Sequence, residues 1–317
     1  MNFSRPDPKL PMFVYGALKV DEIAWLQISD YVVDHKKSVL NDYELRIADG
    51  IAFASPRKGK VVLGDTLYFR PDRDALAVYS IIATFEGTGK ADSNYQWVQV
   101  DVEGEAANLL ELRGRLGLAV EANSWSLVDD EAFAKGVPWL REKLSESVTE
   151  LERFTAPAAK DSSYWNAFFQ AQACFVFMWG IQERLELFRF GVTDDTKIAK
   201  PDGRLASVRS MGDRRKEMGQ DPVFKFALDQ AGIDKQLEVR GYRNPTGKAR
   251  SSAESAISTW FEIRNNIAHH AKGSERDVEK LIAGALDNFN TLLIYLKLIS
   301  PQLAEEWGHL TTIEKSL

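Results

Sequence analysis

The sequence contains little cysteine, little histidine and no long uninterrupted apolar segment. Cys174 is the single cysteine among 317 residues, so it cannot form an internal disulfide, and no Cys/His cluster has zinc-site spacing. The longest strongly apolar run, Ala173 to Ile181, is far shorter than the roughly 20 residues of a membrane helix. The first residues lack the apolar stretch of a signal peptide. We therefore expect a soluble, cytoplasmic protein with no metal and no cofactor.

The sequence also lacks an excess of positive charge. Its 40 Lys and Arg residues are outnumbered by 46 Asp and Glu residues, which gives a formal net charge of −6. Such a chain does not coat nucleic acid or bind a membrane through its overall charge, so any contact with nucleic acid has to be local. A length of 317 residues with 44% hydrophobic content predicts two domains, each with a packed core.

The sequence pattern changes along the chain. Between residues 12 and 102 short apolar runs are cut by Gly, Pro and Asp, which predicts strands, and Gly64 indicates a bend or a close backbone approach. From residue 105 leucines recur at spacings of three and four, which predicts helices. A Pro-containing stretch at 154–163 is typical of a linker. We predict an α+β chain with a β domain at 1–104, a helical connector and linker at 105–160, and a helical bundle at 161–317.

Four helices are predicted in the bundle, at 164–190, 221–231, 251–271 and 276–299, with an irregular insert at 193–250. The insert has six cations against two acids between residues 200 and 216, and four cations with no acid between 240 and 250. A solvated loop is the simplest interpretation. The alternative is a phosphate-binding surface, for which we select as RNA-binding residues Arg214, Arg215, Lys216 and Arg243.

Two of the four histidines, His269 and His270, are adjacent at the end of the predicted helix 251–271. Arg264 falls within the apolar stripe of this helix, where a guanidinium needs an anion or a subunit seam. His269 follows five residues later and lies on a different face of an ideal helix, so a distorted helix end or a second protomer has to bring the two side chains together. The stripe itself consists of Ala253, Ala256, Ile257, Trp260, Ile263 and Ile267.

These residue types suit metal-free cleavage of RNA. An imidazole with a pKa near neutrality takes the proton of a ribose 2′-hydroxyl, and a guanidinium stabilises charge on the phosphate. Asn265, one turn before His269, can orient the imidazole or bond the phosphate. The simpler alternative is a pair of ordinary surface residues near a helix end. Within the catalytic hypothesis, His270 is the alternative base.

The segment Arg264-Asn265-Asn266-Ile267-Ala268-His269 resembles the R-x4-H motif of the HEPN superfamily. The first predicted bundle helix, with Gln182-Glu183-Arg184-Leu185, also looks like the HEPN opening helix with its inward acid. The resemblance covers roughly residues 161 to 300. It implies an all-α bundle and a metal-independent endoribonuclease, with Arg264, Asn265 and His269 at the seam of a homodimer. It further implies a toxin or an antiviral defence effector, whose partners are RNA and an antitoxin or a phage-derived trigger.

A second resemblance lies in the N-terminal half. Phe13-Val14-Tyr15-Gly16-Ala17-Leu18, the strand 59–69 and the pair Glu86-Gly87 resemble the gamma-glutamylcyclotransferase-like fold across residues 11–102. This implies a small mixed β-barrel that binds a gamma-glutamyl-like ligand at Tyr15, Gly16, Ala17 and Leu18. It also implies that Glu86 is an acid/base with a raised pKa.

The N-terminal sequence departs from that family at two positions. Ala17 stands where the family has Ser or Thr, and Trp97 stands where a later strand often carries Arg. Loss of a hydroxyl and of a charge favours ligand sensing over turnover. We therefore predict an endoribonuclease with a sensing domain. The alternatives are a gamma-glutamylamine cyclotransferase whose bundle only dimerises, and a non-catalytic sensor or scaffold in which Glu86 caps a turn.

Overall fold

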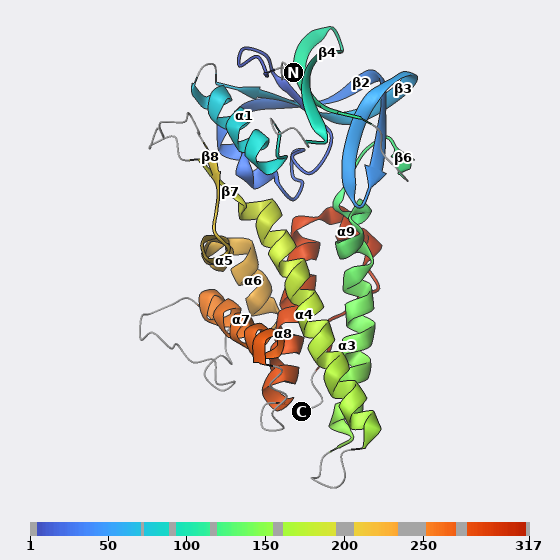
Figure 1. Ribbon diagram of the computed structural model, residues 1–317, viewed down its shortest axis with the longest axis vertical. Helices are drawn as coiled ribbons and strands as arrows, with labels where there is room; N and C mark the ends of the chain where they lie inside the picture. The colour runs from blue at the N-terminus through green and yellow to red at the C-terminus, as the bar shows by residue number, and fades with distance from the viewer. Residues whose placement is uncertain are drawn as a thin grey trace. The chain divides into compact units, whose positions relative to one another are not determined.

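The computed structural model describes residues 5–70, 73–88, 93–114, 119–154, 161–194, 206–233, 252–270 and 278–314 (Figure 1). The chain forms two compact units. The first combines Met1–Glu131 with Leu187–Ser210, and the second combines Ala132–Glu186 with Met211–Leu317. The class is α+β, because the sheet lies in the first unit and the second is helical.

The first unit is built on a mixed sheet of six strands in the order β4-β5-β1-β3-β2-β6. Strand β1 pairs antiparallel with β3 and parallel with β5, and the other neighbours are antiparallel. The strands are β1 (Met12–Val14), β2 (Val32–Ala48), β3 (Ile51–Phe69), β4 (Tyr95–Val102), β5 (Glu105–Leu112) and β6 (Val120–Ala122).

The sheet is open, so the expected β-barrel is wrong. Among the strands that the structure describes, β4 and β6 are the two edges and each pairs on one side only. Closure of a barrel requires its first and last strands to pair. Strand β6 is three residues long and pairs with the Leu45–Ile47 part of β2, which leaves the sheet with two edges.

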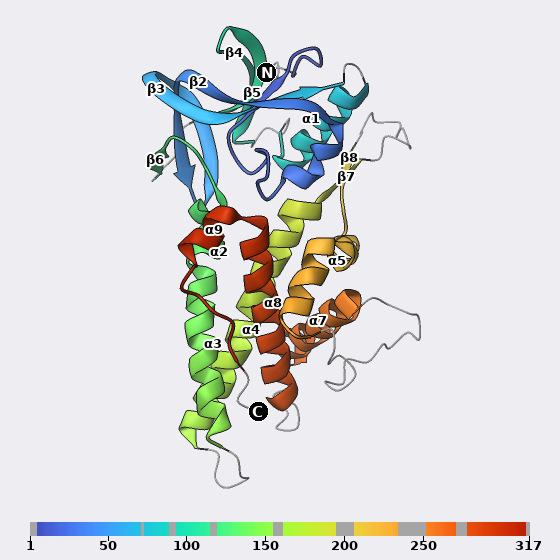
Figure 2. The ribbon, with the colours of Figure 1, turned by 180° about the vertical axis from the view of Figure 1, so that it is seen from behind.

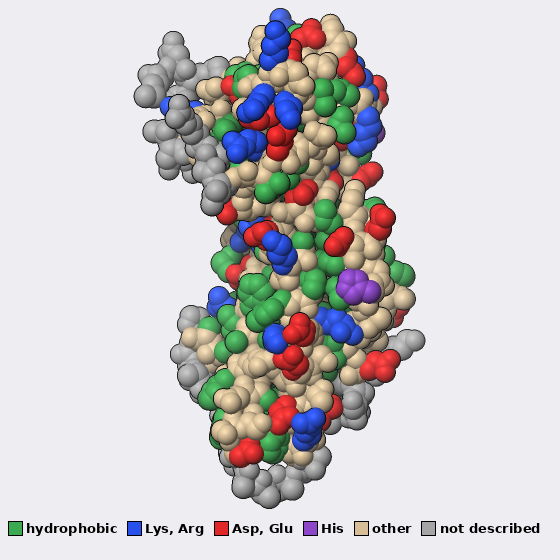
Figure 3. All heavy atoms as spheres, turned by 90° about the vertical axis from the view of Figure 1, so that its right-hand side faces the viewer, with side chains coloured by type: hydrophobic (Ala, Val, Ile, Leu, Met, Phe, Trp, Pro, Cys, Tyr) green, Lys and Arg blue, Asp and Glu red, His purple; other side chains and the backbone are tan. Residues whose placement is uncertain are grey.

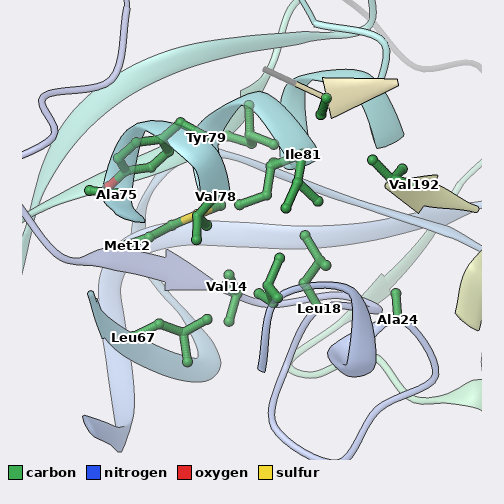
Figure 4. Close-up of a cluster of buried hydrophobic side chains, with 14 of the residues drawn as sticks. Met12, Val14, Leu18, Ala24, Leu67, Ala75, Val78, Tyr79, Ile81 and Val192 are labelled. Atoms are coloured by element: carbon green, nitrogen blue, oxygen red, sulfur yellow. The ribbon is translucent and has the colours of Figure 1, made fainter. Parts of the chain in front are cut away.

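Helix α1 (Arg73–Phe85) packs on the sheet and completes the core of the first unit. Figure 4 shows Val78 and Ile81 of this helix among side chains that include Met12 and Val14 of β1. The short strands β7 (Val192–Asp194) and β8 (Ala206–Val208) pair with each other and lie against α1. The remaining short elements are η1 (Trp25–Gln27), η2 (Ser29–Tyr31) and η3 (Leu127–Asp129).

The second unit consists of helices around α8, which packs against α3, α6, α7 and α9 (Figure 2). Trp179, Trp260, Phe289 and Tyr295 are fully buried in it. The helices, with α4 ending in the first unit, are α2 (Glu131–Ala134), α3 (Gly136–Glu152), α4 (Ser162–Phe190), α5 (Met211–Gln220), α6 (Pro222–Gln230), α7 (Ser252–His270), α8 (Val278–Ile299) and α9 (Pro301–Glu306).

Helix α8 is the one helix in the described part of the chain that is long and apolar enough to cross a membrane. Its most apolar stretch of 18 residues has a mean hydropathy of 1.2, and 72% of that stretch is buried inside the structure. This burial is what a core helix requires. The surface has a different character, since Figure 3 shows a face on which hydrophobic side chains lie among charged ones.

Three features differ from the sequence-based predictions. Residues 105–112 form strand β5 and not a helix, because Glu103 and Gly104 both have positive φ and turn the chain into a hairpin with β4. The leucine spacing misled because β5 is buried on both faces. Helix α5 lies in the stretch predicted to be irregular. The predicted boundaries lie after residues 104 and 160, and in the structure 105–131 and 187–210 belong to the first unit.

Gly64 allows a close backbone approach, as the sequence indicated. A Cβ at this position of β3 would lie 2.2 Å from the carbonyl oxygen of Val14 and 2.7 Å from Cζ of Phe13. We expect Gly64→Ala to lower the free energy of unfolding by about 2 kcal/mol or more, because the strands would have to separate. Gly16→Ala is the matched control, since its Cβ would lie 3.6 Å from that of Ala52. Equal urea midpoints for the two variants would contradict this prediction.

Candidate functional site

Helix α7 carries the predicted R-x4-H motif and is continuous from Ser252 to His270. Trp260 is fully buried, whereas Ile263 and Ile267 are only half-buried, so the apolar stripe becomes more exposed toward the motif. Arg264 is half-buried, and its Nη1 donates a hydrogen bond to Oδ1 of Asn265 at 3.1 Å. The structure therefore joins two of the predicted catalytic residues.

The backbone of His269 and His270 belongs to α7, but their side chains lie outside the described residues, and so does the whole of Arg243. Because α7 stays helical to His270, Arg264 and His269 start about 140° apart around its axis, at about 100° per residue. No distortion before His270 brings the two side chains together. Of the two routes expected from the sequence, a distorted helix end and a second protomer, the helical backbone through His270 favours the second protomer.

Helix α5 brings a predicted RNA-binding arginine next to α7. The guanidinium carbon of Arg215 lies 3.9 Å from the centre of the Phe261 ring, a close cation–π contact, and its Nε donates to the carbonyl oxygen of Met211 at 3.1 Å. Phe261 precedes Arg264 by three residues, so the two lie on the same side of the helix. Arg215 and Arg264 are therefore placed along one side of α7.

A buried acid on α4 faces the arginines of α5. Burial raises the pKa of Glu186 to about 7, while the charges of Arg215 and Arg214 act in the opposite direction. Gln182 Nε2 donates to Glu186 Oε1 at 3.0 Å. Nε of Arg214 is buried with no hydrogen-bond partner within the described ranges, whereas the third predicted cation of α5, Lys216, is exposed.

Sequence reasoning missed Glu186 and emphasised Glu183. Glu183 is half-buried and accepts a hydrogen bond from Nε1 of Trp179 at 2.7 Å, so it supports a core tryptophan. Glu186 is the more deeply buried of the two acids. The signal that could have found it is its spacing of four residues from Gln182, which places the amide and the carboxylate on one side of α4.

In the first unit, Glu86 lies where helix α1 ends. Its N–H donates to the carbonyl oxygen of Ile82, and Thr88 N–H donates to that of Ala83 at 3.0 Å. Gly87 between them has φ of +64°, so the pair Glu86-Gly87 forms a Schellman-type helix end. Burial of the Glu86 carboxyl raises its pKa to about 7. No hydrogen bond to this carboxyl is found among the residues that the structure describes.

Glu86 lies close to two phenols, the buried Tyr15 and the partly buried Tyr95. Burial and the Glu86 charge both raise the pKa of Tyr15 and that of Tyr95. Tyr15 donates from its hydroxyl to the carbonyl oxygen of Leu110 at 2.6 Å, and Tyr95 donates to that of Ala52 at 2.8 Å. The structure thus brings the predicted Tyr15 and Glu86 together. Tyr95 was missed, although it opens β4, the strand that also carries Trp97.

The other predicted ligand-loop residues have structural contacts. Leu18 is part of the hydrophobic core, and the carbonyl oxygen of Ala17 accepts a hydrogen bond from Ala24 N–H at 2.9 Å. Gly16 does not have positive φ. Trp97 is buried and meets the Tyr79 ring edge-on at 5.3 Å.

Two further observations concern metals and cavities. Within the described ranges, no three His, Cys, Asp or Glu side chains gather as metal ligands. A cavity of about 580 Å³ in the second unit lies between α3 and residues 311–314, and it is lined by none of the predicted site residues.

The raised pKa of Glu86 makes the free energy of unfolding depend on pH. In the unfolded chain this carboxyl ionises near 4.5, and in the folded chain near 7, so stability falls as pH rises through that interval. Glu86→Gln removes the buried charge, so we expect this variant to gain stability over the wild type between pH 5 and pH 8. Glu103→Gln, at an exposed turn, is the control. A difference in urea midpoint that stays constant with pH would contradict the prediction.

Comparisons with known proteins assign no family to the chain. No protein-family model and no curated protein matches it. The crystal structure of an uncharacterised protein from Pyrococcus horikoshii is similar over 40% of this chain and 97% of that chain, with 15% sequence identity and a TM-score of 0.29. A likeness at this TM-score carries no argument about fold or function.

Proposed function

We propose that the chain is a metal-independent endoribonuclease of the HEPN type. The proposal rests on the contacts along one side of α7. Arg264 donates a hydrogen bond to Asn265 there, and Arg215 lies over the ring of Phe261. Guanidinium groups bind phosphate through several parallel N–H donors and keep their charge at every relevant pH. Two of them along one helix side suit the recognition and cleavage of a phosphodiester. This support comes from contacts and is independent of the R-x4-H spacing.

In the proposed mechanism, His269 takes the proton of a ribose 2′-hydroxyl. The 2′-oxygen attacks the adjacent phosphorus and the bond from phosphorus to the 5′-oxygen breaks. The 5′-oxygen leaves with the proton that the imidazolium of His269 returns. Arg264 stabilises the extra negative charge on the phosphate oxygens during the attack. Asn265 uses its Oδ1 to orient Arg264, which leaves its Nδ2 free to donate to the phosphate. The products are a 2′,3′-cyclic phosphate and a 5′-hydroxyl.

The wider proposal follows the family resemblance. The protein would act in the cytoplasm as a homodimeric toxin or antiviral effector, neutralised by an antitoxin or activated by a phage-derived trigger. The first unit would regulate it by sensing a small gamma-glutamyl-like ligand near Tyr15 and Glu86. The support for a sensing site is the desolvated Glu86 carboxyl beside the buried Tyr15 and the partly buried Tyr95.

The same carboxyl favours a second candidate function. A general base works best when its pKa lies near the working pH, and burial raises the pKa of Glu86 to about 7. In this alternative, Glu86 takes a proton from the α-amino group of a gamma-glutamyl amine, which closes to 5-oxoproline and releases the amine. Incubation of the intact protein with total RNA and with a gamma-glutamyl amine separates the candidates. A non-catalytic sensor or scaffold would yield neither product.

Substitution of the motif tests the nuclease proposal. We expect Arg264→Ala and His269→Ala each to lower RNA cleavage about 100-fold or more, because each removes a group that acts on the reacting phosphate or hydroxyl. Thermal unfolding should change little. Arg153→Ala, at an exposed arginine paired with Glu150, is the matched control and should cleave normally. If His270→Ala loses cleavage while His269→Ala retains it, the wrong histidine has been chosen.

Removal of metal tests the chemistry. Since the proposed acid, base and charge-stabilising groups are side chains, cleavage should continue in excess EDTA and leave 2′,3′-cyclic phosphate and 5′-hydroxyl ends. The ends are read by whether a 5′-kinase labels the products without prior phosphatase treatment. Cleavage that stops in EDTA and returns with magnesium would sink this mechanism.

A further inference from the structure

Helix α4 contains a long stretch without charge. From Ser162 to Gln182 the helix has no Asp, Glu, Lys, Arg or His. A helix on the surface of a globular protein normally has a polar face opposite its apolar face. A helix that is apolar all round is typically buried on all sides. The only strongly polar side chains of this stretch are the uncharged amides of Asn166, Gln170, Gln172 and Gln182, so most of the circumference of α4 is expected to be covered.

One side of this helix is nonetheless exposed. We call it the α4 stripe, and its residues recur at three- and four-residue spacings: the half-buried Trp165 and the exposed Phe169, Ala173, Val176, Phe177 and Gly180. The exposed, uncharged Asn166 lies on the same side. Phe169 is 57% exposed, Phe177 43% and Val176 38%. The opposite side is packed into the second unit through Phe168, Phe175 and Met178, which are buried.

Aromatic contacts hold the exposed rings in place. Trp139 of α3 is 45% exposed and meets Phe177 edge-on, with ring centres 5.5 Å apart. Trp165 and Phe169 stack at 5.9 Å with an interplanar angle of 28°. Rings that are already fixed by neighbours lose little conformational entropy when a partner covers them. This surface is therefore organised in advance for association.

The exposed area is of the size that an interface centre needs. If a fully exposed aromatic residue presents about 200 Å², the α4 stripe and Trp139 expose roughly 350 Å² of apolar surface. This is as large as the largest apolar patches on typical monomers. It is a little under half of the roughly 800 Å² that each partner contributes to a standard interface, the rest of which is a more polar rim.

We propose that the α4 stripe and Trp139 pair with the same surface of a second copy of this chain. A two-fold interface needs a surface that is complementary to itself. The stripe meets this need, because Phe169 and Phe177 project on either side of Ala173, where a ring of the second copy can lie. It also has no charge that a partner of opposite charge would match. Two α4 helices that cross at Ala173 would bring this residue close to its own copy.

This inference deepens the proposed function, since it names the surface through which two copies would pair. It rests on the proposed function only for the role of the dimer, and the pairing surface itself is argued from exposure and aromatic contacts. The helix that carries the paired surface also contacts the motif helix, because the buried Trp179 of α4 packs against Phe261 of α7 with ring centres 5.8 Å apart. Its test measures mass and cross-linking and not RNA cleavage, so a failure of the α4 stripe as the interface is distinguishable from a failure of the nuclease chemistry.

The first experiment compares two exposed phenylalanines of the second unit in the intact protein. Wild type should sediment at equilibrium with about twice the chain mass of 35.7 kDa. Phe169→Glu should sediment as a monomer with unchanged circular dichroism, because it places a charge in the interface. Phe226→Glu is the matched control, since Phe226 of α6 is 52% exposed and lies outside the stripe. It should remain a dimer.

The second experiment places a thiol at the proposed two-fold axis. Ala173→Cys should form a covalent dimer under mild oxidation, whereas Phe226→Cys should not. The native Cys174 is buried, so the wild type should give little background. A wild type that is monomeric throughout the micromolar range would overturn the proposal. So would a Phe169→Glu variant that stays dimeric, or a wild-type monomer that uses Phe169 to bind neutral lipid vesicles.

Discussion

The need to cover helix α4, which has no charged residue from Ser162 to Gln182, governs the second unit. Helix α4 buries Phe168, Phe175, Met178 and Trp179, and none of these side chains could face water without a cost of about 1.5 to 3 kcal/mol each. Helices α7 and α8 supply the opposing surface, with Trp260 and Phe289 fully buried. The arginines of α5 are then held near Glu186 because α4 is fixed. The candidate nuclease site therefore depends on the packing of a helix that contributes no charge over most of its length.

The helices could be predicted from the spacing of their apolar residues, whereas the pairing of the strands could not. The sequence predicted α4, α6, α7 and α8 because each has a stripe of large side chains at helical spacing. Helix α1 was missed since residues 75–82 are almost continuously apolar and lack a clear period. Strand β5 was taken for a helix because its leucines recur at helical spacing, although both of its faces are buried. Whether the sheet stays open depends on which strands pair with each other, and this pairing joins residues that are far apart in the sequence.

The candidate sites show the same limit. The proximity of Arg264 and Asn265 follows from their adjacency, and the charge of α5 identified Arg215. Glu186 and Tyr95 were missed because their importance lies in burial next to groups that are distant in sequence. Burial raises the pKa of Glu86 and that of Glu186 to about 7, and a carboxyl so placed adds nothing to stability when ionised. Such costs are typically kept where a protein binds or reacts.

The chain crosses between the two units more than once. It passes from the first to the second after Glu131, returns at Leu187, and leaves again after Ser210. Segments of the two units therefore leave the ribosome in alternation. The core of the first unit includes Val192 and Ala206, so it cannot be completed until residue 206 has left the ribosome. By then α3 and α4 have been synthesised, but α8, against which the second unit packs, has not. During synthesis the aromatic surface of α4 is thus exposed for the time needed to translate about a hundred further residues, at about 5 to 20 residues per second.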